Sequence, residues 1–153
     1  MYSKKEASEL RQQFWTAFGQ YMLPIAGAEG EKINWINYKT GEKEVYFKMA
    51  ADSKSASISI EMAHKDLGLQ QIYFDQFQQL RNLLQSVLTE EWDWEPQVAD
   101  EHNRTISRII TRVDGVNIFD RNDWPKLISF FKPRLIALDA FWSSAKYAFE
   151  ALR

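Results

Sequence analysis

The feature that most constrains the fold is a stretch of strict alternation near the middle of the chain, Ser55–Met62. Every second residue of this stretch is apolar, and the residues between them are serines and one glutamate. Since successive side chains of a strand point to opposite faces, the pattern predicts a half-buried β-strand. The rest of the chain can be read around it, with one helix and two strands before it and two helices and two strands after it.

The segment before this strand predicts a helix followed by two strands. Ser3 and Glu6 have the form of a capping box, and apolar residues at helical spacing follow to about Met22. Ile33–Tyr38 and Val45–Met49 then flank a short polar stretch that suits a hairpin turn. Together with the central strand, they predict an antiparallel meander of three strands. Ile33–Tyr38 is apolar on both faces, as is typical of a strand covered on both sides.

A long amphipathic helix is expected next. Asp66 is placed to cap it, and a broad apolar stripe continues from Leu69 to Leu88. Burying each large apolar side chain of this stripe contributes roughly 1.5–3 kcal/mol, so we expect the helix to lie across the sheet.

Two further strands and a last helix complete the pattern. One strand is expected near Trp92–Val98 and another across Thr105–Val113; the second also fits a helical stripe, but its Ile, Thr and Val content and the closing Asp-Gly favour a strand. Asp123 is expected to be the N-cap of the last helix, with Pro125 in its first turn. Pro133 should kink or divide that helix.

These elements predict an α+β fold with a mainly antiparallel five-stranded sheet packed by long helices, in the order α-β-β-β-α-β-β-α. A chain of 153 residues is near the usual size of one domain, so we expect a single globular domain over residues 1–153. Apolar residues make up 45% of the chain and aromatic residues 14%, which predicts a core rich in rings. Trp92 and Trp94 are interpreted as part of that core, with stacking on a base or another ligand as the alternative.

Composition excludes several classes of function. The chain has no cysteine, which excludes disulfides, thiolate catalysis and cysteine-based zinc sites. The net charge of −2 gives no overall attraction to nucleic acid or to an anionic membrane, so such binding would need a local patch. The charged first residues do not resemble a signal peptide, and no run of about 18 apolar residues occurs. We therefore expect a cytoplasmic protein with no membrane partner.

Three short motifs carry a resemblance to a known family: Trp92-x-Trp94, Gly115-Val116-Asn117-Ile118 and Asp120-x-x-Asp123-Trp124. With the long helix before them, they make most of the chain resemble a bacterial domain of unknown function, numbered 4268. That family occurs alone and at the C-terminal end of predicted restriction-type endonucleases. The resemblance implies an accessory module linked to DNA-processing proteins. It brings no catalytic residues, since its motifs look like packing and capping residues.

A metal-dependent nuclease is the sharpest enzyme hypothesis, because the order of elements resembles the start of a restriction-enzyme fold. Such enzymes carry a carboxylate followed on the next strand by Glu-x-Lys, which is absent from this chain. Glu61 lies at a strand end but is followed by Met62-Ala63. We therefore predict no catalytic residues and lean against an enzyme, with a nuclease-related enzyme that has a divergent metal site as the alternative.

No cofactor or metal site is predicted. An acidic run between residues 90 and 101 lacks the spacing of a calcium loop and is interpreted as solvated loops. The two histidines, His64 and His102, are too few for a structural zinc site without cysteine, and no nucleophile motif accompanies them.

One face of the sheet is the candidate binding surface. Even spacing places Arg108 and Arg112, with Arg104 before them, on one face of the expected strand Thr105–Val113. An aromatic residue and a lysine of an earlier strand can share that side. Cations beside an aromatic ring on a sheet can follow a phosphate backbone. The alternative is an ordinary charged face, with Glu44 and Glu61 as ion-pair partners. The candidate binding residues are Tyr46, Lys48, Arg104, Arg108 and Arg112.

The sequence thus favours a non-catalytic binding or accessory module whose partner is a protein or a nucleic acid. A homodimer that uses the surplus of aromatic residues as its subunit interface is a third reading.

Overall fold

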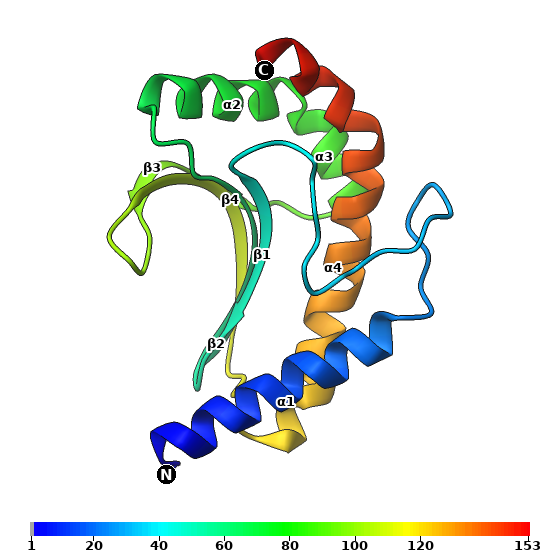
Figure 1. Ribbon diagram of the computed structural model, residues 1–153, viewed down its shortest axis with the longest axis vertical. Helices are drawn as coiled ribbons and strands as arrows, with labels where there is room; N and C mark the ends of the chain where they lie inside the picture. The colour runs from blue at the N-terminus through cyan, green and yellow to red at the C-terminus, as the bar shows by residue number, and fades with distance from the viewer. Residues whose placement is uncertain (1) are drawn as a thin grey trace.

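The computed structural model describes residues 2–153 and contains a curved, four-stranded antiparallel sheet with helices packed on one side of it (Figure 1). In chain order the elements are α1 (Lys4–Met22), β1 (Val45–Ala51), β2 (Ser55–Met62), α2 (Leu67–Gln79), α3 (Arg81–Leu88), β3 (Asp93–Ala99), β4 (Thr105–Asp114) and α4 (Trp124–Ala145). Short 3-10 helices lie at Arg121–Asp123 and Lys146–Leu152. The predicted α+β class and antiparallel sheet are confirmed.

The central strand predicted from the alternation is β2, which pairs with β1 on one side and β4 on the other in the order β1-β2-β4-β3. Its apolar residues face the helices and are 0–2% exposed. β4 is a strand rather than a helix, and the register aligns Glu61 of β2 with Tyr46 of β1 and Arg108 of β4. The period of two in β2 therefore fixes which residues of its neighbours share a face.

The predicted strand at Ile33–Tyr38 is wrong, so the sheet has four strands, not five. This segment forms a turn in which the backbone N–H of Asn37 donates to the side chain of Asn34 at 3.2 Å. Its rings are anchored separately: Trp35 donates to the carbonyl of Ile25 at 2.9 Å, and the Tyr38 hydroxyl donates to Asp139 of α4 at 2.5 Å. The apolar residues are thus buried without any strand pairing.

Asp139 holds the connection between α1 and β1 at a second point. Its other carboxylate oxygen accepts a hydrogen bond from the backbone N–H of Ala28 at 2.7 Å. Burial, followed by the bond to Asp139, raises the pKa of Tyr38, so this tyrosine stays protonated at neutral pH. One buried carboxylate on the last helix therefore fixes both halves of a long connection that belongs to no strand.

The single long helix expected between Asp66 and Leu88 is divided into α2 and α3, which makes the order α-β-β-α-α-β-β-α. Leu80, with φ −98° and ψ 11°, leaves helical geometry although neither glycine nor proline lies nearby. Figure 1 shows α2 across one end of the sheet and α3 beside α4. One straight helix could not pack in both directions, so tertiary packing overrides the continuous apolar stripe.

Helix ends follow the sequence with one exception. The Ser3–Glu6 capping box forms, and Asp66 accepts from the N–H of Leu69 at 3.1 Å. Asp123 occupies the predicted N-cap position of α4, but its side chain makes no cap bond and instead accepts from the N–H of Asn117 at 2.9 Å. Pro133 does not divide α4, which continues past it.

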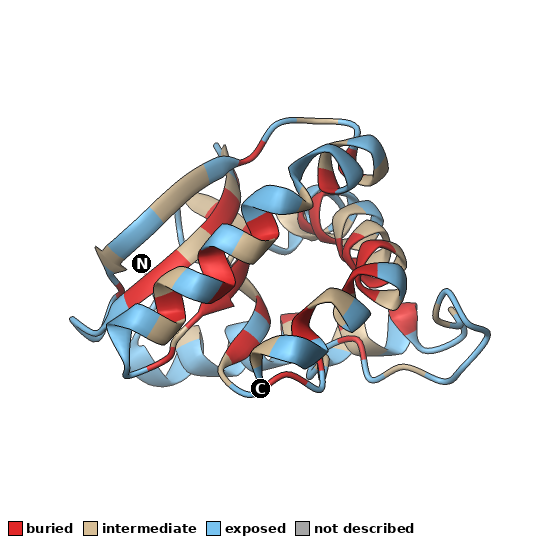
Figure 2. Ribbon diagram, turned by 90° about the horizontal axis from the view of Figure 1, so that it is seen from above, coloured by how far each residue is buried: buried red, intermediate tan, exposed pale blue. Residues whose placement is uncertain are grey.

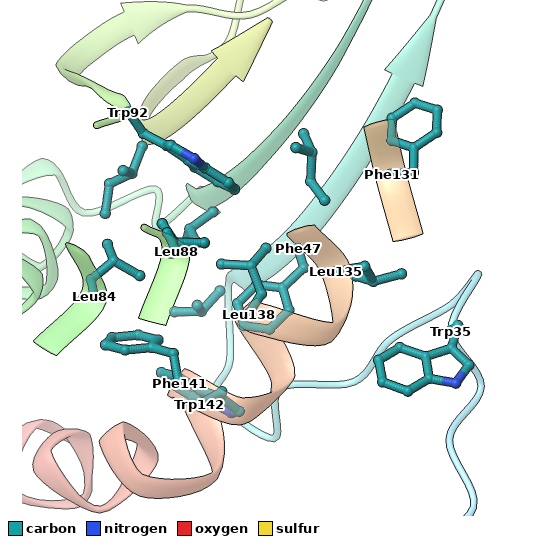
Figure 3. Packing of buried hydrophobic residues seen from close by; sticks show 14 of the residues in the cluster. Trp35, Phe47, Leu84, Leu88, Trp92, Phe131, Leu135, Leu138, Phe141 and Trp142 are labelled. Atoms are coloured by element: carbon teal, nitrogen blue, oxygen red, sulfur yellow. The ribbon is translucent and has the colours of Figure 1, made fainter. Parts of the chain in front are cut away.

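The core between the sheet and the helices is rich in rings, as predicted. Figure 2 shows buried residues gathered where helices and strands face one another, and Figure 3 shows Trp92, Phe141 and Trp142 within this cluster. Trp92 is only 6% exposed, and Trp94 meets the edge of Phe74 with ring centroids 5.7 Å apart. The interpretation as a core residue is confirmed for Trp92, whereas Trp94 is only partly buried and packs against the margin of the core.

Gln70 of α2 is a fully buried polar clamp between this helix and the sheet. Its amide nitrogen donates to the carbonyls of His64 and Thr105 at 3.0 and 3.1 Å, and its oxygen accepts from the Ser107 hydroxyl at 2.7 Å. The Ser107 oxygen in turn accepts from the N–H of Gln97 at 3.0 Å. One side chain thereby joins α2 to the end of β2 and the start of β4.

We expect Gln70→Leu to lower the free energy of unfolding by roughly 1–3 kcal/mol, because it leaves buried polar partners unsatisfied. Gln78→Leu, on the exposed side of α2, is the matched control and should change it by less than about 0.5 kcal/mol. Urea unfolding of the three proteins measures both values. Equal effects of the two substitutions would contradict the clamp.

Candidate binding surface on the sheet

The outer face of the sheet is the side that points away from the helices, and Figure 1 shows no helix of the described chain covering it. Strand alternation and register assign its side chains. β2 contributes three serines and Glu61, flanked by larger residues of β1, β4 and β3. We define the outer face by Tyr46, Lys48, Ala50, Ser55, Ser57, Ser59, Glu61, Asp93, Glu95, Arg108, Ile110 and Arg112.

The register arranges opposite charges side by side across the strands. Tyr46, Glu61, Arg108 and Glu95 form one row from β1 to β3. Lys48 lies diagonally across from Glu61, with its Nζ 3.4 Å from Glu61 Oε1. Burial raises the pKa of Glu61, and attraction to Lys48 only partly offsets this. Glu61 is therefore a buried carboxyl group at the middle of the outer face, beside Ser59 and Ile110, which are also buried.

The two arginines of β4 share one carboxylate. Arg108 Nε lies 2.6 Å from Glu95 Oε1, and Arg112 lies 3.4 Å from the same oxygen and 3.9 Å from Asp93. Partial burial opposes ionisation of Glu95, but hydrogen bonds and attraction from both arginines outweigh it and lower the pKa of this carboxyl. Glu95 is thus charged at neutral pH and neutralises the centre of the arginine pair.

Arg104 has a different setting, because it precedes β4 in the turn that follows β3. Its Nε lies 3.0 Å from Asp100 Oδ2, and Asp100 also accepts the backbone N–H groups of Arg104 and His102. Desolvation opposes ionisation of Asp100, but these bonds outweigh it and lower its pKa. Arg104 therefore helps to fix the turn and stands at the rim of the outer face.

Two adjacent hollows, of about 630 and 640 Å³, lie over this face. Both are lined by Tyr46, Lys48 and Glu61. The first extends along β1 and over the serines of β2, and the second reaches Arg104 and His64. Tyr46, 42% exposed, stands where the two hollows meet. A contiguous concave surface of this kind has room for a segment of another molecule.

The structure brings Tyr46, Lys48 and Arg108 close together, extends the face to Arg112, and leaves Arg104 at the rim. Of the two expected ion-pair partners, Glu61 is used, whereas Glu44 makes no ion pair within residues 2–153. The remaining partners come from the acidic run, so its interpretation as solvated loops is wrong in part. Only the β3–β4 register could have revealed this, because it places Glu95 directly opposite Arg108.

A second polar cluster, outside the outer face, lies in a hollow of about 690 Å³ beneath the start of α2. Glu42, 6% exposed, accepts from the Tyr73 hydroxyl at 2.9 Å and lies 2.6 Å from the guanidinium of Arg153. Burial, with the bond to Glu42, raises the pKa of Tyr73 to about 12. The His64 ring lies 4.3 Å from that of Tyr73, and within residues 2–153 neither ring nitrogen has a hydrogen-bond partner.

Neither cluster shows the arrangement of a metal centre. Across residues 2–153, no group of three or more histidine, aspartate and glutamate side chains is placed to hold an ion. None of the helices in this part of the chain is long and apolar enough to span a membrane.

The architecture defines a class of α+β domain in which helices cover one side of a four-stranded antiparallel sheet and leave the other open. A family model described as Domain of unknown function (DUF4268) matches residues 10–146, and the chain belongs to that family. No curated protein matches the chain, and no solved structure does.

The buried ring of His64 predicts a pH dependence of stability. Burial lowers its pKa, and attraction from Glu44, Glu42 and Asp66 only partly opposes this. A base with a lowered pKa binds its proton more readily in the unfolded chain, so stability is full above about pH 6.5 and falls as the pH drops toward the folded pKa.

We expect His64→Phe to reduce the loss of unfolding free energy between about pH 7.5 and about pH 5.5. Urea unfolding at the two pH values measures this difference. His102→Phe is the control, because that side chain is 69% exposed, and it should leave the pH dependence unchanged. An identical pH dependence in wild type and His64→Phe would rule out His64 as its source.

Proposed function

We propose that this domain is a non-catalytic binding module whose outer sheet face binds a protein partner. The contact residues are Tyr46, Lys48, Arg108 and Arg112, with Arg104 at the rim. The observation that supports this most is that the outer side of the sheet carries two hollows over β1, β2 and the start of β4, whereas the other side is packed against helices. A sheet face with a purely structural role does not require concave space of this size.

The charge arrangement favours a protein over a nucleic acid. Each of the four cations lies within 4 Å of a carboxylate, so a phosphate would have to displace Glu61, Glu95 or Asp100. These carboxylates would repel the phosphate backbone at the same distances. A protein surface carries both signs of charge. Ion pairs within the outer face can therefore be replaced by ion pairs with that surface, and no charge is left unpaired.

The setting is part of the same proposal. Family members at the C-terminal end of predicted restriction-type endonucleases would make this domain an accessory module of DNA-processing systems in the cytoplasm. A nuclease-related enzyme with a divergent metal site is the alternative, and no observation on the described residues favours it. The two hypotheses predict different effects of a divalent ion on thermal stability. Mg²⁺ or Mn²⁺ should raise the melting temperature of a metal-binding enzyme, but it should not change the melting temperature of a binding module.

A photo-crosslinking amino acid placed at Tyr46 tests the proposed surface. We expect p-benzoylphenylalanine at this position to crosslink in cells to a defined protein, and the double substitution Arg108→Ala/Arg112→Ala to reduce the yield. Tyr21, on α1, is the matched control because it is a tyrosine of similar exposure, 50% against 42%. The same adducts from both positions would refute a specific surface.

A salt series with single- and double-stranded DNA and RNA decides between the two partner classes. We expect no binding that weakens with salt. Salt-dependent binding that is reduced by Arg108→Ala/Arg112→Ala would replace the protein partner with a phosphate backbone.

A further inference from the structure

The two edges of the sheet differ in how they are protected. β3 carries Pro96, and its pairing with β4 shifts register between Glu95 and Val98, where Gln97 has φ 46°. Proline and a bulge are devices that prevent another strand from pairing at an edge. β1, at the other edge, has no proline, no glycine and no break in register over Val45–Ala51. One edge is therefore blocked, and the other is regular.

The hydrogen-bond pattern shows which groups of β1 face outward. At its two ends the ladder with β2 is fixed by bonds from Ala63 N to Glu44 O and from Asp52 N to Ser55 O. Bonded residues alternate in an antiparallel pair, so the even-numbered residues of β1 bond to β2. The N–H and C=O groups of Phe47, Met49 and Ala51 consequently point away from β2. Within residues 2–153, they have no hydrogen-bond partner.

Within residues 2–153, Val45 is the one residue of β1 whose outward backbone groups are hydrogen-bonded. Val45 donates to the carbonyl of Glu42, and its own carbonyl accepts from the Thr40 hydroxyl at 2.8 Å. Beyond it, the hollow of about 630 Å³ is lined by every residue from Tyr46 to Asp52, so it follows the edge itself as well as the outer face. Its opposite wall is formed by Ile36, Asn37 and Tyr38.

We propose that the free edge of β1 binds an extended peptide of a protein partner as an added strand. This deepens the proposed function, on which it rests. Outward N–H and C=O groups at every second residue, from Phe47 to Ala51, match the backbone of another strand. The bases and sugars of a nucleic acid do not present hydrogen-bond donors and acceptors with the spacing of alternate residues in a β-strand.

The side chains beside the edge define the chemistry of the peptide. Tyr38 stacks on Phe47 with ring centroids 4.9 Å apart, so the wall lies on the helix side of β1, and Ile36 is 39% exposed there. Peptide residues on that side are apolar. On the outer face, Lys48 is the one charged residue of β1, and its side chain is 41% exposed. The residue opposite Lys48 is therefore acidic, because opposite charges on neighbouring strands attract.

A second copy of this chain fits less well, because pairing of β1 with itself about Lys48 would place two lysines directly opposite each other. If β1 of the two copies pairs about a residue other than Lys48, the two lysines are not directly opposite each other. The experiment below therefore has to distinguish self-association from peptide binding.

A phage-displayed library of random linear peptides is the probe. We expect selected peptides to alternate apolar and acidic or polar residues. Synthetic versions carrying N-methyl groups should lose binding when these occupy one set of alternate residues and keep it when they occupy the other. Binding that is insensitive to this parity would overturn the inference.

Two variants of one position separate the backbone from the side chain. Met49→Pro removes an outward N–H without touching a bond to β2, and Met49→Ala removes most of the side chain but keeps that N–H. We expect Met49→Pro to weaken peptide binding about fivefold or more relative to Met49→Ala, as the loss of one net hydrogen bond predicts. Ala51→Pro, at the next outward residue, replaces it if Met49→Pro fails to fold.

Amide hydrogen exchange supplies the direct readout. The amides of Phe47, Met49 and Ala51 should exchange quickly in the free protein and slowly with peptide bound. Protection of these amides in the free protein together with a doubled mass would assign the edge to a second copy and overturn the inference. If selected peptides bind Met49→Pro as tightly as Met49→Ala, or if none is selected, the edge inference fails, whereas the crosslink from Tyr46 still decides the proposed function.

Discussion

The burial of one face of β2 is the constraint on which the rest of this structure depends. Its four apolar residues are almost completely inaccessible, and the strand lies between β1 and β4, so its register determines the facing of both neighbours. A slip of one residue would turn serines and Glu61 into the core. Gln70 reinforces this register from the helix side, because its partners lie at the end of β2 and the start of β4.

The same register explains why the outer face is balanced in charge rather than basic. The arginines of β4 are spaced evenly, and β3 brings Glu95 opposite Arg108 while β2 brings Glu61 opposite it from the other side. Burial raises the pKa of Glu61 in this row, and attraction to Lys48 only partly opposes that shift.

The sequence predicts correctly those elements that are determined by residues close to one another along the chain. The alternation in β2, the Ser3–Glu6 box and the Asp66 cap are all in place. The failures depend on distant contacts. Ile33–Tyr38 has the composition of a strand, but the Tyr38 hydroxyl donates a hydrogen bond to Asp139, about a hundred residues later in the chain. The segment forms a turn instead of a strand. The break at Leu80 has no local cause, because it follows from packing α2 on the sheet and α3 on α4.

The candidate site divides in the same way. Spacing alone predicts that Arg108 and Arg112 share one face of β4, and the register of the sheet places Tyr46 and Lys48 on that same side. The counter-charges, the hollows and the unpaired edge of β1 depend on which strands become neighbours. No pattern within Val45–Ala51 distinguishes an edge strand from a central one, so the open hydrogen-bonding groups could only be found from the assembled sheet.

The carboxylate of Asp139 has a consequence for the order in which the molecule is completed during synthesis. It holds Ala28 and Tyr38 across sequence separations of 111 and 101 residues. The wall beside β1 therefore cannot be fastened until α4 has left the ribosome, long after β1 and β2 are able to pair. In that interval the edge of β1 lacks the wall formed by Ile36, Asn37 and Tyr38, and an exposed strand edge on an incompletely folded chain is prone to aggregate.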